Sequence, residues 1–353
     1  MGYIIIAIFV LTIFLSLLEE HIQKYRPALY IILAVALILL AGLREVGIDP
    51  DSENYEYTFL HYYNARALEQ VEFSYLFFSK IINTFTNDVH ALFLLYALSG
   101  VGLKFMALRK FSKLWFLPIA VYLSYYFVQH ECMQIRTGVL SGIMLFIIMK
   151  IADGERRQAL VLLIIGTLFH YSALLLLPLF FLSNKEMSIR QVKIWAMIIP
   201  LAYIFHFAGF SLFMSGVAQI PLVGSKLANY QEITIKGTGQ FGVNVFSPLQ
   251  LFTVTLYYYL LIFHKTITRE NKYYPLLMKV FTLGIFSYVS FSFFPVVAQR
   301  VTMLFQLVNI ILYANIYYTI RPKWAAVSTV MLIGLIYLNY SLPNVGVILF
   351  WEV

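Results

Sequence analysis

Long apolar runs separated by short polar segments dominate this chain. Runs of about 20 residues that lack charges are typical of transmembrane helices. They fall near residues 3–18, 28–43, 91–108, 114–129, 137–151, 159–182, 194–213, 248–264, 274–294, 301–320 and 324–342. We therefore expect an all-α fold, a polytopic transmembrane helical bundle.

Two polar segments interrupt this pattern. Residues 44–90 carry eight carboxylates against three basic side chains, and residues 214–247 are Gly-rich and weakly charged. The sequence shows no repeat and no segment with the composition of a soluble domain. We therefore treat 1–353 as a single integral membrane domain with loops 44–90 and 214–247 outside the cytoplasm.

Composition supports the same class. The chain is 61% hydrophobic and 12% charged, whereas a soluble domain carries about 25% charged residues. The net charge of +8 reflects basic cytoplasmic loops, so we expect no nucleic-acid partner. Cys132 is the sole cysteine, which excludes an intramolecular disulfide and a thiolate metal cluster. The apolar start, Met1 to Leu18, lacks a basic segment and a cleavage site, so it predicts a retained first helix.

Basic clusters set the expected orientation, because Lys and Arg concentrate in cytoplasmic loops. The clusters are Lys24/Arg26, Lys104/Arg109/Lys110/Lys113, Lys150/Arg156/Arg157, Lys185/Arg190/Lys193, Lys265/Arg269/Lys272 and Arg321/Lys323. All six fall on one side only if 159–182 is a re-entrant helical hairpin that breaks near 169–172. We therefore expect about 10 full spans plus this hairpin.

This orientation places several ionisable residues at the opposite, outer face. They are Arg44, Asp49, Arg136 and Arg300, with His170 at the hairpin tip. Gly47 and Pro50 predict a tight turn that returns Asp49 toward Arg44. Arginines gathered at one membrane face suggest a site for an anionic group such as a lipid-linked phosphate.

Structural roles remain open for each residue. Arg44 could be a helix-end residue whose side chain snorkels to the interface. An ion pair with Glu131 would explain Arg136, and His170 could be a buried hydrogen-bonding residue. Arg300 has no acidic neighbour in sequence, and an intramembrane charge costs roughly 2.5–3.5 kcal/mol on insertion scales.

Familiar catalytic motifs are absent. No G-x-S-x-G, P-loop or G-x-G-x-x-G sequence occurs, and no His/Asp/Glu cluster has metal-ligand spacing. The sequence therefore supports neither ATP-driven transport nor a metal site, and we expect no cofactor.

Four short motifs, in order, resemble Wzy-type polysaccharide polymerases, especially their EpsG-like branch. They are Gly42-Leu43-Arg44 with Gly47-Ile48-Asp49, Tyr55 and Phe59; Gln134-Ile135-Arg136; Leu168-Phe169-His170-Tyr171-Ser172-Ala173; and Gln299-Arg300. The resemblance spans 42–305. Thr137 departs from the Gln that many relatives carry after the arginine.

The resemblance implies a GT-C-like membrane glycosyltransferase of the bacterial inner membrane, with its active site facing the periplasm. Its substrates would be undecaprenyl-diphosphate-linked oligosaccharides, joined into O-antigen, capsule or exopolysaccharide without nucleotide sugar or metal. Membrane lipid and a chain-length regulator protein are the other expected partners. We expect the substrate-binding residues to be Tyr55, His130, Gln134, Tyr171 and Gln299.

Acceptor activation needs a base, for which Asp49 and His170 are the outer-face candidates. We favour Asp49, because carboxylates serve this role in related chemistry. Three other functions remain open: a flippase for lipid-linked oligosaccharide, a glycan ligase, and a membrane O-acyltransferase that uses His170. A flippase should show inverted repeats and charges along a path across the bilayer, and neither is evident.

Overall fold

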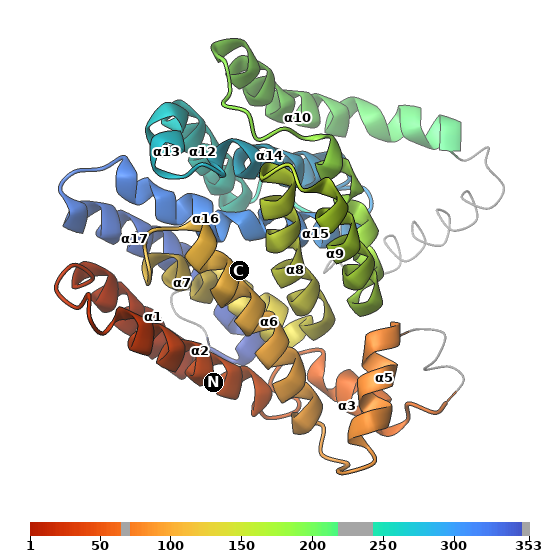
Figure 1. The fold of residues 1–353 in the computed structure, drawn as a ribbon. Helices are drawn as coiled ribbons and strands as arrows, with labels where there is room; N and C mark the ends of the chain where they lie inside the picture. The colour runs from red at the N-terminus through yellow and green to blue at the C-terminus, as the bar shows by residue number, and fades with distance from the viewer. Residues whose placement is uncertain (65–70, 218–242, 348–353) are drawn as a thin grey trace. The chain divides into compact units, whose positions relative to one another are not determined.

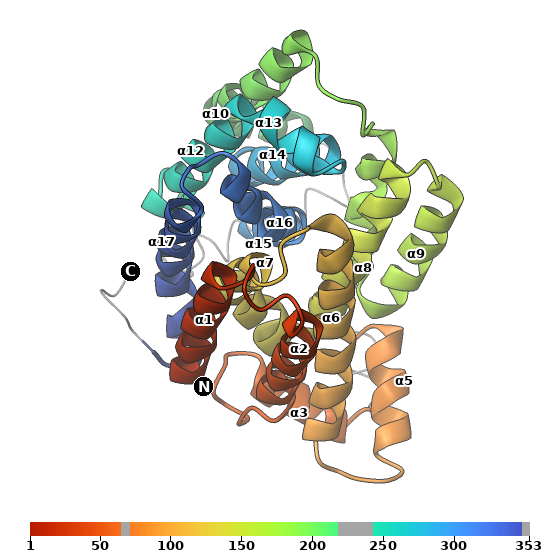
Figure 2. The ribbon, with the colours of Figure 1, turned by 60° about the vertical axis from the view of Figure 1, so that its left-hand side comes forward.

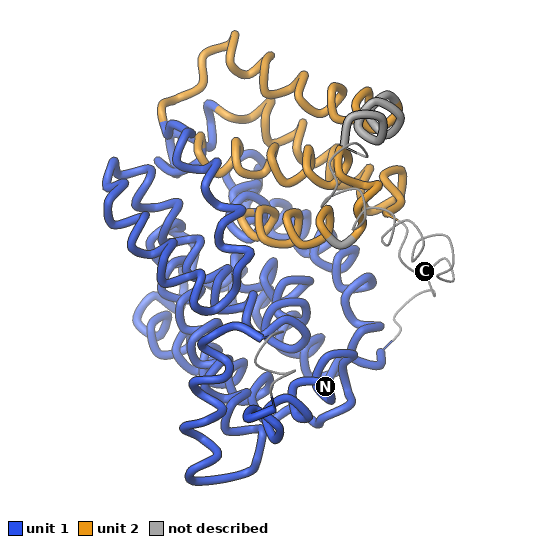
Figure 3. The backbone as a smooth tube through the Cα atoms, turned by 90° about the vertical axis from the view of Figure 1, so that its right-hand side faces the viewer, with its two compact units in different colours: residues 1–184, 265–274, 309–353 blue, residues 185–264, 275–308 orange. Residues whose placement is uncertain are grey.

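The computed structural model describes residues 1–64, 71–217 and 243–347, and every regular element within these ranges is helical. The helices form two compact units, residues 1–184, 265–274 and 309–353, and residues 185–264 and 275–308 (Figure 3). The single membrane domain expected from the sequence stays a prediction.

Most of the first unit comes from the first half of the chain. Its helices there are α1 (Gly2–Leu17), α2 (Arg26–Gly42), α3 (Ser52–Leu60), α5 (Phe73–Ile82), α6 (His90–Phe111), α7 (Leu117–Val121), the π-helical η1 (Tyr122–Tyr126) and η2 (Val128–Met133), α8 (Ile135–Ala152), α9 (Arg156–Phe169) and the 3-10 helix η3 (Tyr171–Phe181). Helix α6 packs against α2 and α8, and α8 packs against α9 (Figures 1 and 2).

Later segments complete both units. The first unit adds most of α13 (His264–Glu270), α16 (Asn309–Ala314), η5 (Asn315–Tyr318), α17 (Lys323–Ser341) and η6 (Leu342–Val345). The second unit contains α10 (Ile189–Val217), α12 (Pro248–Ile262), most of α14 (Tyr274–Ser290), α15 (Pro295–Phe305) and η4 (Gln306–Val308). Each apolar run predicted from the sequence coincides with helical structure.

The helices have the properties of membrane helices. Among the described residues, four are long and apolar enough to cross a bilayer, at His90–Phe111, Ile135–Ala152, Val297–Tyr318 and Lys323–Val345, and six shorter helices are also apolar. In α2, Leu33 and Leu37 are buried, while Ile31, Ile32 and Val35 are exposed. A helix that is apolar on its exposed face as well is suited to a lipid environment. The chain is therefore a helical membrane protein.

The segment 44–90 is more structured than a loop. It contains α3 and α5, which pack against each other, and α5 also packs against α6 and α9. Only residues 65–70 of it lie outside the described residues. The other predicted loop, 214–247, falls mostly at 218–242, also outside the described residues.

The predicted break in 159–182 is present. Helix α9 ends at Phe169, His170 has extended backbone (φ −158°, ψ 130°), and η3 packs back on α9. Both ends of this hairpin lie beside Lys272, whose Nζ is 2.9 Å from Asp153 Oδ1 and whose carbonyl accepts a 3.0 Å hydrogen bond from Asn184. The chain therefore leaves and returns at the same end of the first unit, and the passage of the hairpin into a membrane stays a prediction.

A buried ion pair joins α6 to η2 and α8. Lys104 Nζ lies 2.5 Å from Glu131 Oε1 and donates to Gly138 O at 2.6 Å, and Tyr122 Oη donates to the same Glu131 oxygen at 2.8 Å. Grouping Lys104 with the loop cations is therefore wrong, because its side chain is fully buried within α6. Gly100 gives the Glu131 carboxylate room, since a Cβ at that position would overlap it.

We expect Gly100→Ala to lower the melting temperature of the purified protein in detergent, because overpacking a core costs typically about 1–3 kcal/mol. Gly102→Ala is the matched control: it lies in the same helix, and its Cβ would meet no heavy atom within 4 Å. The control should be neutral or stabilising, because Ala favours a helix over Gly by up to about 1 kcal/mol. Equal melting temperatures for the two variants would contradict this packing.

Accessibility of single cysteines tests the orientation. Cys132 is fully buried, so the parent protein should give a low labelling background. Asn64→Cys should react with a membrane-impermeant maleimide applied to intact cells. Asn184→Cys should react only after permeabilisation, because the hairpin returns the chain to the cytoplasmic side. Labelling of Asn184→Cys from outside would show that 159–182 crosses the membrane once.

Candidate active site

The turn after α2 brings Asp49 back to Arg44, as the sequence predicts. Gly47 has φ +90°, a conformation that glycine adopts without steric cost. Asp49 Oδ2 then lies 2.9 Å from Arg44 Nε, and both side chains are fully buried. The other oxygen of Asp49 accepts hydrogen bonds from the backbone N–H groups of Asp51 (3.1 Å) and Ser52 (3.0 Å) at the start of α3.

These contacts give Asp49 a positioning role. A general base must reach the proton it removes, within about 2.6–3.2 Å. Asp49 has no exposed side-chain surface, and both of its oxygens are already engaged. The structure therefore does not support Asp49 as the base that we favoured from the sequence.

Arg44 is held from several sides. Its Nη1 donates to Ala41 O at 2.8 Å, and its Cζ lies 3.9 Å from the centre of the Phe93 ring. Its carbonyl oxygen lies 3.0 Å from His90 Nε2. Only Nη2 is buried without a hydrogen-bond partner among the described residues. Arg44 does not simply snorkel to the interface, since it ties α2 to α6 and to the turn before α3.

Arg136 forms its ion pair with a residue that the sequence did not single out. Its Nη1 contacts the Oε2 atom of Glu72, which precedes α5. The alternative pairing with Glu131 is wrong, because Glu131 is bound to Lys104. The Arg136 side chain is 20% exposed and that of Glu72 is 7% exposed, so this pair lies closer to the surface than Arg44 and Asp49.

His170 approaches the same carboxylate from the tip of the hairpin. Its Nδ1 accepts a hydrogen bond from Ser172 N at 3.0 Å. A neutral imidazole that accepts at Nδ1 carries its proton on Nε2, and Nε2 lies 3.5 Å from Glu72 Oε1. The two oxygens of Glu72 thus face Arg136 and His170. Arg136 and His170 follow Glu72 by 64 and 98 residues in the sequence, yet both contact its carboxylate.

Tyr55 connects this pair to the turn at Gly47. The Arg136 guanidinium lies 5.7 Å from the centre of the Tyr55 ring. Burial raises the pKa of Tyr55 to about 12, with Arg136 and Arg44 acting in the opposite direction. Burial likewise raises the pKa of Asp51, and the charges of Arg136 and Arg44 oppose that rise. Tyr55 and Asp51 therefore lie in the electrostatic field of both arginines.

The remaining predicted residues are more scattered. His130 is fully buried and neither ring nitrogen has a partner among the described residues, so it offers no surface to a substrate. Gln134 is half-buried just before α8, and Tyr171 is 65% exposed next to His170. Gln299 and Arg300 are exposed on α15 in the second unit. The convergence of Arg300 with Arg44 and Arg136 stays a prediction.

The first unit thus brings together Arg136, His170 and Tyr55 around Glu72, which sequence reasoning missed. The sequence did contain a signal: Glu72 directly precedes an apolar helix in the acidic segment predicted to be outside. The arrangement places an imidazole and a guanidinium against the two oxygens of one carboxylate at a partly exposed position. Such a group can stabilise an anion and move a proton.

Comparisons with known proteins agree with the motifs. The sequence model of the EpsG family matches residues 27–347. The amylovoran biosynthesis protein AmsC of Erwinia amylovora is 24% identical over 328 residues, which cover 88% of this chain and 84% of AmsC. No solved structure matches the chain. Because the family match covers most of its length, the chain belongs to the EpsG family.

Proposed function

We propose that this protein is a polysaccharide polymerase that joins lipid-linked repeat units. Its donor and acceptor are oligosaccharides carried on undecaprenyl diphosphate, and the reaction takes place on the periplasmic or outer face of the bacterial inner membrane. Membership of the EpsG family and similarity to a protein named for amylovoran biosynthesis support a role in exopolysaccharide synthesis. A chain-length regulator is the proposed protein partner.

The observation that carries the proposal is the contact of Glu72 with both Arg136 and His170. In the reaction, a hydroxyl oxygen of the acceptor attacks the anomeric carbon of the donor. The bond from that carbon to the diphosphate oxygen breaks, and the diphosphate leaves with the electron pair. A planar guanidinium suits the resulting phosphate oxygens, because it can donate two parallel hydrogen bonds.

Glu72 is our candidate for the base. Both nitrogens of His170 are committed, Nδ1 to the Ser172 N–H and Nε2 toward the carboxylate. Glu72 is thus the group of this cluster that can accept a proton, once one of its two engaged oxygens is released. A bound diphosphate would compete with Glu72 for Arg136 and so release the carboxylate. Glu72 would then take the proton of the acceptor hydroxyl, with His170 holding its other oxygen.

Arg300 is the proposed second contact for the lipid diphosphate. It is exposed in the middle of α15 and forms no ion pair with any described residue. An exposed arginine on the predicted outer side runs against the general concentration of basic residues in the cytoplasm. A ligand phosphate would supply the missing partner.

Arg136→Lys and Glu72→Gln test this cluster. Each variant is expressed in a strain that lacks its own copy of the gene, and the glycan ladder and the lipid-linked single units are measured. Loss of one preorganised contact to a developing charge costs about 10²–10³-fold in rate. We therefore expect long glycan to disappear while single units accumulate, at a membrane protein level equal to wild type.

Arg157→Lys is the control for these variants, because Arg157 is exposed at the start of α9, beside the other end of the hairpin. It should retain the complete ladder. A complete ladder from Glu72→Gln would remove the proposed base. Loss of the single units themselves, with no ladder, would indicate a step before polymerisation, such as transport of the lipid-linked unit.

Arg300→Lys tests the second contact by keeping the charge and removing the planar fork. We expect a strongly shortened ladder, whereas Arg190→Lys, an exposed arginine on α10 of the same unit, should leave it unchanged. Complete restoration by Arg300→Lys at normal protein level would assign Arg300 to anchoring at the interface.

A further inference from the structure

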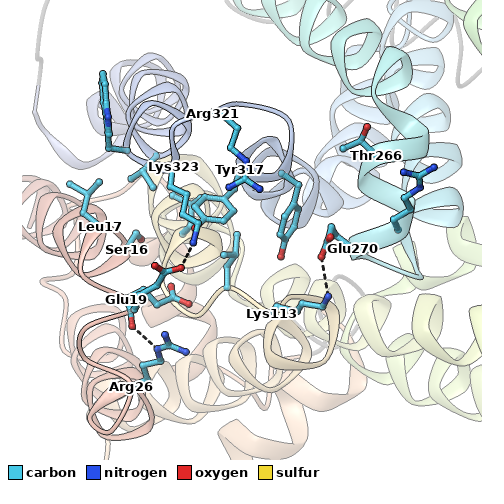
Figure 4. A pocket seen from close by; sticks show the side chains of 17 residues that line it. Ser16, Leu17, Glu19, Arg26, Lys113, Thr266, Glu270, Tyr317, Arg321 and Lys323 are labelled. Atoms are coloured by element: carbon cyan, nitrogen blue, oxygen red, sulfur yellow. Dashed lines mark hydrogen bonds and ion pairs between the residues drawn. The ribbon is translucent and has the colours of Figure 1, made fainter.

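A cavity of about 630 Å³ opens at one end of the first unit (Figure 4). Its walls come from the end of α1, the α1–α2 and α6–α7 connections, α13, and the start of α17 with the turn before it. All of its lining residues belong to the first unit. They include none of the candidate active-site residues.

The lining is rich in cations. Five basic side chains and three acidic ones face the cavity: Arg26, Lys113, Arg269, Arg321 and Lys323, with Glu19, Glu20 and Glu270. Four of the basic clusters predicted to be cytoplasmic contribute to this set. Their meeting at one cavity agrees with a common membrane side for these four loops.

Both lysines of the lining are neutralised by neighbouring carboxylates. Lys113 Nζ lies 3.0 Å from Glu270 Oε2, and Lys323 Nζ contacts Glu20 Oε1. The third carboxylate, that of Glu19, accepts hydrogen bonds from the backbone N–H groups of Trp115 and Phe116. Burial also raises the pKa of Glu19. The three acids are therefore already engaged.

Three arginines of the lining form no ion pair with a carboxylate of the described residues. Arg26 donates from Nε to the carbonyl oxygen of Glu19 at 2.7 Å, and neither Arg269 nor Arg321 forms an ion pair with any described residue. In Figure 4, Arg26 and Arg321 reach the cavity from different elements. Unpaired guanidinium groups that share one cavity favour a ligand with several anionic oxygens.

Part of the wall is apolar and exposed. Leu17 at the end of α1 is 44% exposed, and Trp324 at the start of α17 is 64% exposed. Tryptophan is enriched where membrane helices meet the headgroup region. An apolar rim beside unpaired arginines, at the ends of apolar helices, matches a molecule that joins an anionic phosphate to hydrocarbon. A water-soluble phosphate would leave the apolar rim unused.

We infer that this cavity binds the phosphate of an anionic phospholipid of the cytoplasmic leaflet. Arg26, Arg269 and Arg321 hold the phosphate oxygens, and the acyl chains run along Leu17 and Trp324. Basic pockets between helices on the cytoplasmic side are suited to anionic lipid headgroups. The site is separate from the proposed polymerase chemistry, and its occupancy is measurable without activity.

Lipid binding by the purified full-length protein tests this inference. The protein in neutral detergent is titrated with phosphatidylglycerol or phosphatidylcholine, and bound lipid is counted by native mass spectrometry. Wild type should retain phosphatidylglycerol preferentially. Arg269→Gln with Arg321→Gln should weaken this binding by about tenfold or more, because hydrogen bonds to charged groups are lost.

Arg156→Gln with Arg157→Gln is the matched control, since it removes two exposed arginines of the same predicted face outside the cavity. It should bind phosphatidylglycerol like wild type, and all variants should keep their melting temperature in lipid-free detergent. Equal retention of phosphatidylcholine, or equal loss in the control, would overturn the inference. Glycerol 3-phosphate displacing phosphatidylglycerol at equal concentration would identify a site for a soluble phosphate instead, and would also overturn it.

Discussion

Burial of charge in an apolar environment is the constraint on which the first unit depends. Lys104 and Glu131 are both buried, and each is the ion-pair partner that offsets the cost of burying the other. The Gly138 carbonyl and the Tyr122 hydroxyl complete this network. Since removing one partner of such a pair costs about 3–5 kcal/mol, the pair fixes the relative positions of α6, η2 and α8.

The candidate active site follows from that arrangement. Glu131 lies in the π-helical stretch η2, and the chain turns at Gln134 before α8 begins. Arg136 occupies the second position of α8, so the placement of α8 against α6 also places its guanidinium. Helix α5 packs on α6 and α9, which brings Glu72 to Arg136 and to the hairpin tip. The wider turns of π-helical segments are frequent at functional sites.

Two kinds of information were readable from the sequence. Hydropathy located the helices, because the length of each apolar run is set by the thickness of the membrane and does not depend on which helices pack together. The positions of the basic clusters indicated the hairpin, and its break at His170 is present in the structure. Local chemistry was also readable: Gly47 allows the turn, and Asp49 returns to Arg44.

Ion pairs between residues far apart in the chain could not be predicted from the sequence. Arg136 had Glu131 as its nearest acidic neighbour in sequence, yet its partner is Glu72, which another helix delivers. Lys104 belonged by sequence to a basic cluster, but it lies within α6 and turns inward. Such choices depend on which helices pack together. The burial of Arg44, the ion-pair partner of Asp49, is of the same kind, because helix α6 contributes the Phe93 ring that packs on its guanidinium.

The contacts of Lys272 with both ends of the hairpin have a consequence for biogenesis. Asp153 and Asn184 both bind Lys272, which follows them by 119 and 88 residues in the chain. At a synthesis rate of about 5–20 residues per second, roughly 6–24 s separate the appearance of Asp153 from that of Lys272. The hairpin therefore emerges from the ribosome well before Lys272 has been synthesised. During that interval, the contacts of α9 and η3 with each other and with α8 must hold it in place.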